Sequence, residues 1–200
     1  MKSVVFWRCS PTLSGKIMKS LERHLLVATR QLLDPNFAKS VVLLIRHNEE
    51  GALGVVINRP TSKTVNELWQ ELGEGPCHSD FPVCLGGPVP GPLIAVHANM
   101  FFAEMEVIKD VFIAAKRESL DELVLHPGDP LKLFLGHAGW GAGQLESEIE
   151  AGAWITMPAD FEHVFYQGED LWERVIKKIG NQTLLSMLDL KHIPEDPTLN

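Results

Sequence analysis

The fold of this chain is decided by the stretch from Phe134 to Trp154, which reads Phe-Leu-Gly-His-Ala-Gly-Trp-Gly-Ala-Gly-Gln-Leu-Glu-Ser-Glu-Ile-Glu-Ala-Gly-Ala-Trp. An apolar run ends at His137, and closely spaced glycines follow it. Leu145 and Ile149 then stand four residues apart in an otherwise polar segment, as on one face of a helix. Gly152 comes next, where a helix commonly ends. The stretch therefore predicts a strand, a glycine turn, a short helix and a glycine stop.

Length and composition indicate one globular domain. The chain has 200 residues, of which 45% are hydrophobic and 22% charged, so it can bury a core. The formal net charge is -8 and there is no run of Lys or Arg, which disfavours a nucleic-acid partner because such binding requires neutralised phosphates. No apolar run approaches the roughly 20 residues that a membrane span needs, so we expect no membrane association.

The cysteines indicate a reducing compartment and no metal. Cys9, Cys77 and Cys84 are too few and odd in number for a disulfide framework, so we expect a cytoplasmic location. Cys77, His78 and Cys84 could offer metal ligands, but structural zinc sites use closely spaced cysteine pairs. We therefore expect no structural metal, and no motif indicates a cofactor.

Apolar patterning predicts an α+β fold. The expected strands cover residues 25–28, 40–47, 52–57, 83–85, 93–97, 111–115, 131–135 and 154–157. The expected helices cover residues 65–72, which follow the capping-box pattern Thr64-Val65-Asn66-Glu67, and residues 171–179, with a helical turn from Ser119 and a stop at Gly180. Hairpin-like strand pairs outnumber helical crossovers, so we expect a mostly antiparallel sheet with helices packed on it. We place this single domain at residues 21–190, between an irregular extension over 1–20, which does not read as a signal peptide, and a tail over 191–200.

The glycine turn is the first candidate binding site. A strand, a glycine turn and a helix start could present backbone N–H groups to an anion. However, Gly139, Gly141 and Gly143 alternate and Gln144 follows them, so neither the dinucleotide nor the phosphate-loop spacing is present. The alternative is a tight turn that lets Trp140 pack and lets two backbones cross closely. The missing motif residues favour this alternative.

Two further loops could join the glycine turn. Arg59, at a strand end, could bind a carboxylate or phosphate through two hydrogen bonds, or could pair with a neighbouring acid or with backbone carbonyls. Gly86 and Gly87 could form a backbone nest or, more simply, a bend. Because all these loops follow predicted strands, we hypothesise that they meet at one edge of the sheet and bind a ligand. The residues of this expected site are Asn58, Arg59, Gly86, Gly87, Gly139, Trp140, Gly141 and Gln144.

Nucleophilic catalysis has no signature in the sequence. The serine-hydrolase motif G-x-S-x-G is absent. His47 or His137 could act as a base beside Asp34 or Glu146, but each histidine is more often a satisfied core or surface residue. We therefore assign no catalytic residue and keep a hydrolase-like enzyme only as an alternative.

Several separate motifs together resemble one family. These are Leu25–Thr29, Leu33–Phe37, Ser40–Leu44, His47, Gly51–Gly54, Asn58-Arg59-Pro60, Gly86–Val89, Phe134–Gly136, Ala138–Gly141 and Gly143–Glu146. Their identity and order are similar to those of the YqgE/AlgH family over roughly residues 20–180. The chain departs from that family's usual pattern at Arg30, which stands in place of Pro, at Lys39, in place of Arg, and at His137, in place of Tyr. Lysine at position 39 weakens any bidentate role there.

The resemblance implies a compact, cytoplasmic bacterial protein with a bent, largely antiparallel sheet. Some relatives are called transcriptional regulators of exopolysaccharide production, yet the sequence contains no evident DNA-reading helix and the net charge disfavours one. We therefore expect a non-enzymatic ligand-binding or regulatory module whose partner is an unknown small ligand or protein. The alternatives are the hydrolase-like enzyme and a nucleic-acid-associated transcriptional regulator.

Overall fold

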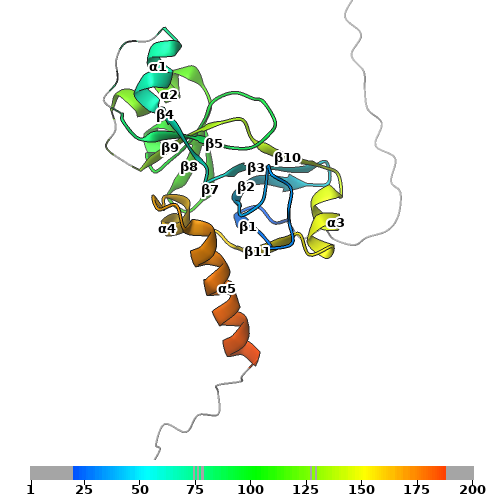
Figure 1. Cartoon of the computed structure of the whole chain (residues 1–200). Coiled ribbons are helices and arrows are strands. Elements are labelled where there is room, and N and C mark those ends of the chain that lie inside the picture. The colour runs from blue at the N-terminus through cyan, green and yellow to red at the C-terminus, as the bar shows by residue number, and fades with distance from the viewer. Residues whose placement is uncertain are drawn as a thin grey trace, which may run out of the picture.

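Two β-sheets form the frame of the molecule (Figure 1). The computed structural model describes residues 20–187, apart from residues 74, 76, 78, 127 and 129, and gives only the backbone of residues 184–187. The strands are β1 (His24–Ala28), β2 (Val41–Asn48), β3 (Gly51–Val56), β4 (Pro60–Thr64), β5 (Pro82–Leu85), β6 (Ile94–His97), β7 (Met105–Ile108), β8 (Val111–Ala114), β9 (Leu131–Leu135), β10 (Ala138–Gly141) and β11 (Trp154–Pro158). The helices are α1 (Val65–Glu71), the 3-10 helix η1 (Met100–Phe102), α2 (Arg117–Leu125), α3 (Gln144–Glu150), α4 (Phe161–Val164) and α5 (Leu171–Met187).

The strand order confirms the expected α+β class. The five-stranded sheet has the order β10-β3-β2-β1-β11, and each of its neighbouring pairs is antiparallel. The six-stranded sheet has the order β4-β5-β9-β6-β8-β7, and only its β5–β9 pair is parallel. The chain passes between the sheets twice, from β3 to β4 and from β9 to β10. The structure thus has two sheets, joined by these two crossings, where the sequence predicted one bent sheet.

Side-chain alternation along the strands builds three hydrophobic clusters. In β2, Val41 and Leu43 face a central cluster formed by residues of both sheets, whereas Val42 and Leu44 face an outer cluster on the other side of the five-stranded sheet. Alternate residues of a strand point to opposite faces, so a strand covered on both faces reads as an unbroken apolar run. Burial on both faces thus covers residues 41–44 of β2, whereas Arg46, nearer its end, is exposed. A third cluster lies under α1 and α2 on the outer face of the six-stranded sheet.

The capping box predicted for the first helix is present. The Thr64 side chain accepts a hydrogen bond from the Glu67 backbone N–H, and the Glu67 carboxylate accepts one from the Thr64 backbone N–H. These bonds satisfy donors that a helix start leaves open. By contrast, α2 begins at Arg117 with Lys116 as its N-cap, so the helix start expected at Ser119 is two residues late.

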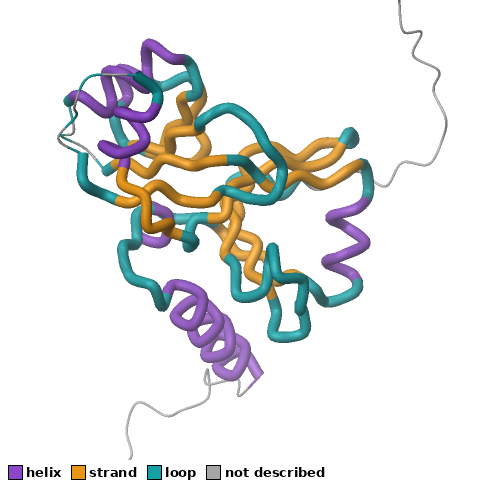
Figure 2. Tube along the Cα trace, turned by 45° about the horizontal axis from the view of Figure 1, so that its top comes forward, coloured by secondary structure: helices purple, strands orange, loops and turns teal. Residues whose placement is uncertain are grey.

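The last helix is longer than predicted. α5 continues through Gly180, so the expected stop there is wrong. A glycine that ends a helix usually takes a positive φ, and Gly180 does not. The first turns of α5 pack on the sheet, where the Trp172 indole N–H donates to the Ala28 carbonyl at 2.7 Å. The rest of α5 projects away from the sheets, as Figure 2 shows.

The deciding stretch contains one more strand than expected. Gly139 and Gly141 lie in β10, which pairs with β3, so the long glycine turn predicted here is wrong. The following helix and its stop are correct: α3 spans Gln144–Glu150, and Gly152 has a φ of 76°. β4, which begins at Pro60, was not predicted; it is an edge strand, where the missing N–H of proline is tolerated. β7 and α4 were also not predicted.

Candidate ligand-binding site

Two glycine-containing segments cross at the junction of the two sheets. The Val56 N–H donates to the Gly86 carbonyl, and the Gly86 N–H donates to the Leu135 carbonyl, both at 2.8 Å. A Cβ at Gly87 would lie 2.3 Å from the backbone carbonyl carbon and oxygen of His137. Only glycine permits such an approach. Gly86, Gly87 and residues 135–138 therefore form a close backbone crossing, which we call the glycine crossing; the sequence had left a backbone nest or a bend open for Gly86 and Gly87.

The β10 end of the expected site is packed and internally hydrogen-bonded. The Gly141 N–H donates to the Gln144 side-chain oxygen at 3.1 Å, and the Gln144 amide donates to a Glu148 oxygen at 2.9 Å. Gly139 is exposed and lacks a positive φ, and a Cβ there would make only ordinary contacts, at 3.9 Å or more, so a side chain at this position would not be strained.

Trp140 belongs to an aromatic cluster that encloses one carboxylate. The indole N–H groups of Trp140 and Trp154 both donate to the same oxygen of Glu148, at 3.0 and 2.8 Å. Phe37 packs against both rings, with centroid distances of 5.9 and 5.5 Å. We call these four side chains the Trp140 cluster. Buried indole N–H groups need acceptors, and Glu148 supplies them.

Asn58 and Arg59 hold the preceding turn rather than an open pocket. The Asn58 side chain accepts from the Val41 N–H at 2.8 Å and donates to the Lys39 carbonyl at 2.9 Å. The Arg59 guanidinium donates to the Ala38 carbonyl at 3.2 Å. Burial lowers the pKa of Arg59, and the charge of Asp34 acts in the opposite direction.

Strand register separates the expected site into parts. Gly141 pairs with Gly51 at the start of β3, whereas Arg59 follows the end of β3. Gly86 lies at the Arg59 end, because its carbonyl accepts from Val56 and the Leu85 N–H donates to the Arg59 carbonyl at 2.8 Å. The structure therefore brings the Asn58–Arg59 and Gly86–Gly87 segments together, whereas Gly141 and Gln144 lie toward the other end of β3.

A histidine–carboxylate pair does exist, but it has no free ring nitrogen. His47 Nε2 lies 2.8 Å from Glu146 Oε1, and the His47 side chain is 1% exposed. Its Nδ1 accepts a hydrogen bond from the Leu21 N–H at 2.9 Å, so the proton of the neutral ring is on Nε2 and is donated to Glu146. A general base needs a nitrogen lone pair facing its substrate. The pair instead fastens the segment before β1 and helix α3 to the end of β2, which does not support the hydrolase alternative.

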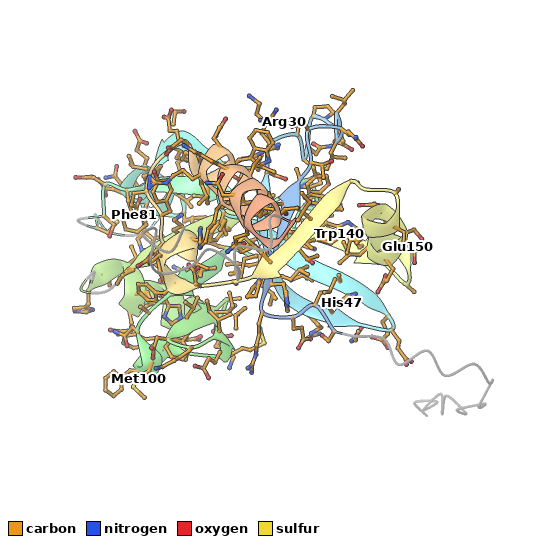
Figure 3. All side chains as sticks on the ribbon, turned by 90° about the horizontal axis from the view of Figure 1, so that it is seen from below. Arg30, His47, Phe81, Met100, Trp140 and Glu150 are labelled. Carbon is orange, nitrogen blue, oxygen red and sulfur yellow. The ribbon has the colours of Figure 1, made fainter. Side chains whose placement is uncertain are left out.

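A cavity of about 470 Å³ lies between β4, β5, β9 and the α4–α5 loop. Its lining residues are Ile57, Asn58, Pro60, Thr61, Ser62, Phe81, Pro82, Cys84, Leu131, Lys132, Tyr166, Gln167, Gly168 and Glu169. Figure 3 shows Phe81, on its wall, on the opposite side of the molecule from Trp140 and His47. Of the expected site residues, only Asn58 lines this cavity.

Lys132 is the buried charge of this cavity. In β9, Leu131 and Leu133 face the cluster beneath α1 and α2, so Lys132 points with Phe134 toward the central side. Lys132 is 7% exposed, and its ammonium donates to the carbonyls of Ile57 at 3.2 Å and Tyr166 at 2.7 Å. Among the residues that the structure describes, no carboxylate forms an ion pair with it. We call this region the Lys132 cavity.

Burial changes the protonation of both ionisable groups in this wall. It lowers the pKa of Lys132 to about 8, because the cation is poorly solvated, while the nearby Cys84 acts in the opposite direction. Burial also raises the pKa of the Cys84 thiol, against the influence of the Lys132 charge. At neutral pH Cys84 is therefore a neutral thiol, and Lys132 is mostly but not wholly a cation.

The α4–α5 loop forms a preformed wall of the cavity. The Tyr166 hydroxyl donates to Asp170 at 2.5 Å and accepts from Arg174 at 3.1 Å, and the Arg174 guanidinium lies 4.9 Å from the Tyr166 ring centre. A Cβ at Gly168 would lie 2.5 Å from the Tyr166 hydroxyl oxygen, so the absence of a side chain at Gly168 lets the Tyr166 ring fold over the loop. Together with the Lys132 bond to the Tyr166 carbonyl, these contacts fix the loop against β9.

Sequence reasoning missed Lys132, although a signal was present. The segment from Leu131 to Leu135 was treated as one apolar strand, but a lysine at its second position must point into one of the two covered faces. A charged residue in such a place is rare without a partner. The presence of Lys132 in an otherwise apolar strand could therefore have identified a candidate site.

The cysteines give no metal cluster in the described part of the chain. Cys77 packs in the cluster beneath α1 and α2, whereas Cys84 packs in the central cluster, and His78 lies outside the described residues. No group of three or more His, Cys, Asp or Glu side chains in the described residues could hold a metal ion. Over the same residues, no helix has the length and apolar character to cross a membrane.

The fold and cavity define a class of small α+β proteins with two mostly antiparallel sheets and a pocket beside their junction. The AlgH-like family profile matches residues 25–184, and the chain belongs to this family. A UPF0301 protein of Myxococcus xanthus is 39% identical over 168 residues, covering 82% of this chain and 93% of that relative. A UPF0301 protein of Chlorobaculum tepidum is 35% identical over 183 residues, covering 88% and 94%.

Two solved structures have a similar fold. The solution structure of AlgH from Pseudomonas aeruginosa has a TM-score of 0.69 and 30% identity, and the match covers 88% of this chain and 97% of that one. The crystal structure of a protein from Corynebacterium diphtheriae has a TM-score of 0.65 and 25% identity, with coverage of 82% and 90%. These relatives carry family names rather than activities, so function must be argued from the site itself.

Proposed function

We propose that the chain is a non-enzymatic binding or regulatory module whose Lys132 cavity takes a small ligand with an anionic group. The observation that carries this proposal is the buried ammonium of Lys132, which lines the cavity and has no carboxylate partner among the described residues. Buried charges in proteins are normally paired, because an isolated one is poorly solvated. An anion in the cavity would supply the missing countercharge.

The size and walls of the cavity support a small molecule as this ligand. A volume of about 470 Å³ falls within the range of known small-molecule sites, roughly 300 to 1,000 Å³. Phe81, Pro82 and Leu131 offer apolar surface, while Ser62 and Gln167 offer polar groups near the rim. The fixed α4–α5 loop reduces the ordering cost of binding. The proposed location is cytoplasmic, in keeping with the free thiols of Cys77 and Cys84.

A titration of the full chain with propionate and with inorganic phosphate tests the proposal. In ¹⁵N-correlated NMR spectra, either anion should shift the amides of Ser62, Gln167 and Gly168 in a saturable manner. Lys132→Met should abolish the shifts, whereas Lys109→Met, at an exposed lysine, should preserve them. Because Lys132 loses its charge above a pKa of about 8, the affinity should fall between pH 7 and pH 9. Shifts that persist unchanged in Lys132→Met, or that spread over the surface, would refute the proposed site.

A further inference from the structure

The Lys132 cavity presents an amine and a thiol, and burial affects their reactivity in opposite ways. Removal from water favours the neutral form of either group. The neutral form of lysine is its nucleophilic form, whereas the neutral thiol is the unreactive form of cysteine. The pKa of Lys132 is lowered to about 8 and that of Cys84 is raised. The cavity therefore favours chemistry at the amine over chemistry at the thiol.

We propose, resting on the binding function above, that Lys132 captures the carbonyl group of a small aldehyde or ketone as an imine in this cavity. The neutral amine adds its lone pair to the carbonyl carbon, and a C–N bond forms. Both amine protons and the carbonyl oxygen then leave as one water molecule, as the C–O bond breaks and the C=N bond forms, so the nitrogen releases its hydrogen bonds to the Ile57 and Tyr166 carbonyls. The step is reversible and requires neither an oxidant nor a reductant.

The hydrogen bonds of Lys132 leave one position of its nitrogen open. A neutral amine has two N–H donors and one lone pair, and the Ile57 and Tyr166 carbonyls accept two hydrogen bonds from this nitrogen. When both N–H groups of the neutral amine donate to these carbonyls, the lone pair of the nitrogen remains free. Lys132 lines the cavity, so a carbonyl compound held there would meet an amine whose orientation is already set.

The protonation state supplies enough nucleophile at neutral pH. With a pKa of about 8, roughly one Lys132 in ten is neutral at pH 7, against about one in 2,500 for an unperturbed lysine. Exposed lysines such as Lys109 and Lys116 are the natural comparison within the same chain. Ile57 packs in the central cluster and also lines the cavity, so it offers apolar surface to a carbonyl compound with a short carbon chain.

Reductive trapping of the full chain tests this proposal. The protein is incubated with propanal, or with the anionic aldehyde glyoxylate, in the presence of sodium cyanoborohydride at pH 7, and the modified peptides are mapped by mass spectrometry. We expect Lys132 to be alkylated at least ~10-fold faster than Lys109, since its neutral fraction is far larger. The rate should rise toward pH 8 and then level off. A Lys132 rate no greater than that of Lys109 would overturn the proposal.

Matched variants separate this proposal from the binding function. Lys132→Arg keeps a cation but cannot form an imine under these conditions, so it should lose the adduct, whereas Lys109→Arg should leave labelling of Lys132 unchanged. Lys132→Met serves if the arginine does not fit. Binding of propionate that depends on Lys132, without a trapped adduct, would refute imine formation alone. A trapped adduct at Lys132 without any anion binding would instead refute the proposed anion site and leave imine formation standing.

Discussion

The Trp140 cluster and the Lys132 cavity both place an ionisable side chain against apolar walls, but only the first gives that side chain a full set of partners. Glu148 accepts from two indoles and from Gln144, and the neighbouring His47 uses both ring nitrogens. Lys132 has two backbone carbonyls and faces a cavity of about 470 Å³. We therefore expect the partnered Glu148 to secure the fold, and Lys132, which has no carboxylate partner among the described residues, to be the group that meets a ligand.

This contrast also distinguishes the two uses of glycine. At the glycine crossing, backbones approach so closely that a side chain would collide with them, so those glycines maintain the junction of the sheets. At Gly168, the absence of a side chain lets the Tyr166 ring fold and shape a cavity wall. Substitutions at the glycine crossing or in the Trp140 cluster should therefore lower the free energy of unfolding. Substitutions at the Lys132 cavity should instead lower the affinity for a ligand.

The largest effect is expected at the glycine crossing. Gly87→Ala places a Cβ 2.3 Å from the His137 backbone, which cannot move without disturbing both sheets. We expect a loss of ~4 kcal/mol in the free energy of unfolding, measured by urea denaturation. The matched control is Gly139→Ala, where the nearest atom would be 3.9 Å away and the change should stay within ~0.5 kcal/mol. Equal costs at the two glycines would show that the close approach is not what glycine provides.

The second effect is the pH dependence of stability that Lys132 should produce. Its pKa is about 8 when folded and about 10.4 when unfolded, so between these values the unfolded chain binds more protons. Stability contributed by this group therefore rises with pH, by at most ~3 kcal/mol, across that window. The difference between wild type and Lys132→Met, followed by denaturation from pH 7 to pH 10, isolates the rise from other titrating groups. A flat difference would mean that Lys132 has the same pKa in both states.

The third effect concerns the pair that fastens α3 to β2. His47→Ala leaves Glu146 without its partner and the Leu21 N–H without an acceptor, which should cost ~2 to 3 kcal/mol of unfolding free energy. Glu146→Gln retains an oxygen that can accept from His47 and should cost less than ~1 kcal/mol. Thermal unfolding of both variants is the measurement. If His47→Ala leaves the thermal unfolding unchanged, these hydrogen bonds do not stabilise the attachment of α3 to β2.

Local sequence signals predicted the fold well where they were complete within one segment. The apolar run of β2, the capping box at Thr64 and the helix spacing from Leu145 to Ile149 all describe neighbours along the chain. β10 was missed because alternating glycines resemble a turn, and only its partner β3 makes Gly139 and Gly141 part of a sheet. Gly180 was mistaken for a stop because a glycine alone does not fix its own φ.

The candidate site was harder to predict because its contacts are distant in sequence. Lys132 reaches the Ile57 carbonyl across 75 positions, and His47 reaches Glu146 across 99. Spacing along a chain cannot reveal such neighbours. We expected site residues where strands end, and Asn58 does line the cavity. The same expectation included Arg59, which follows Asn58 directly but does not line the cavity.

The smallest effect is expected at Arg59, which lies between cavity-lining residues yet is not among the described residues that line the cavity. Its guanidinium donates to the Ala38 carbonyl instead, so Arg59→Ala should cost only ~1 kcal/mol of stability. Anion binding followed by NMR should keep its wild-type affinity, while Lys132→Met should lose it. The sequence alone made Arg59 the charged member of the expected site, so this pair of variants compares the two locations directly. A tenfold loss of affinity in Arg59→Ala, with Lys132→Met unaffected, would move the binding site from the Lys132 cavity to the turn that Arg59 holds.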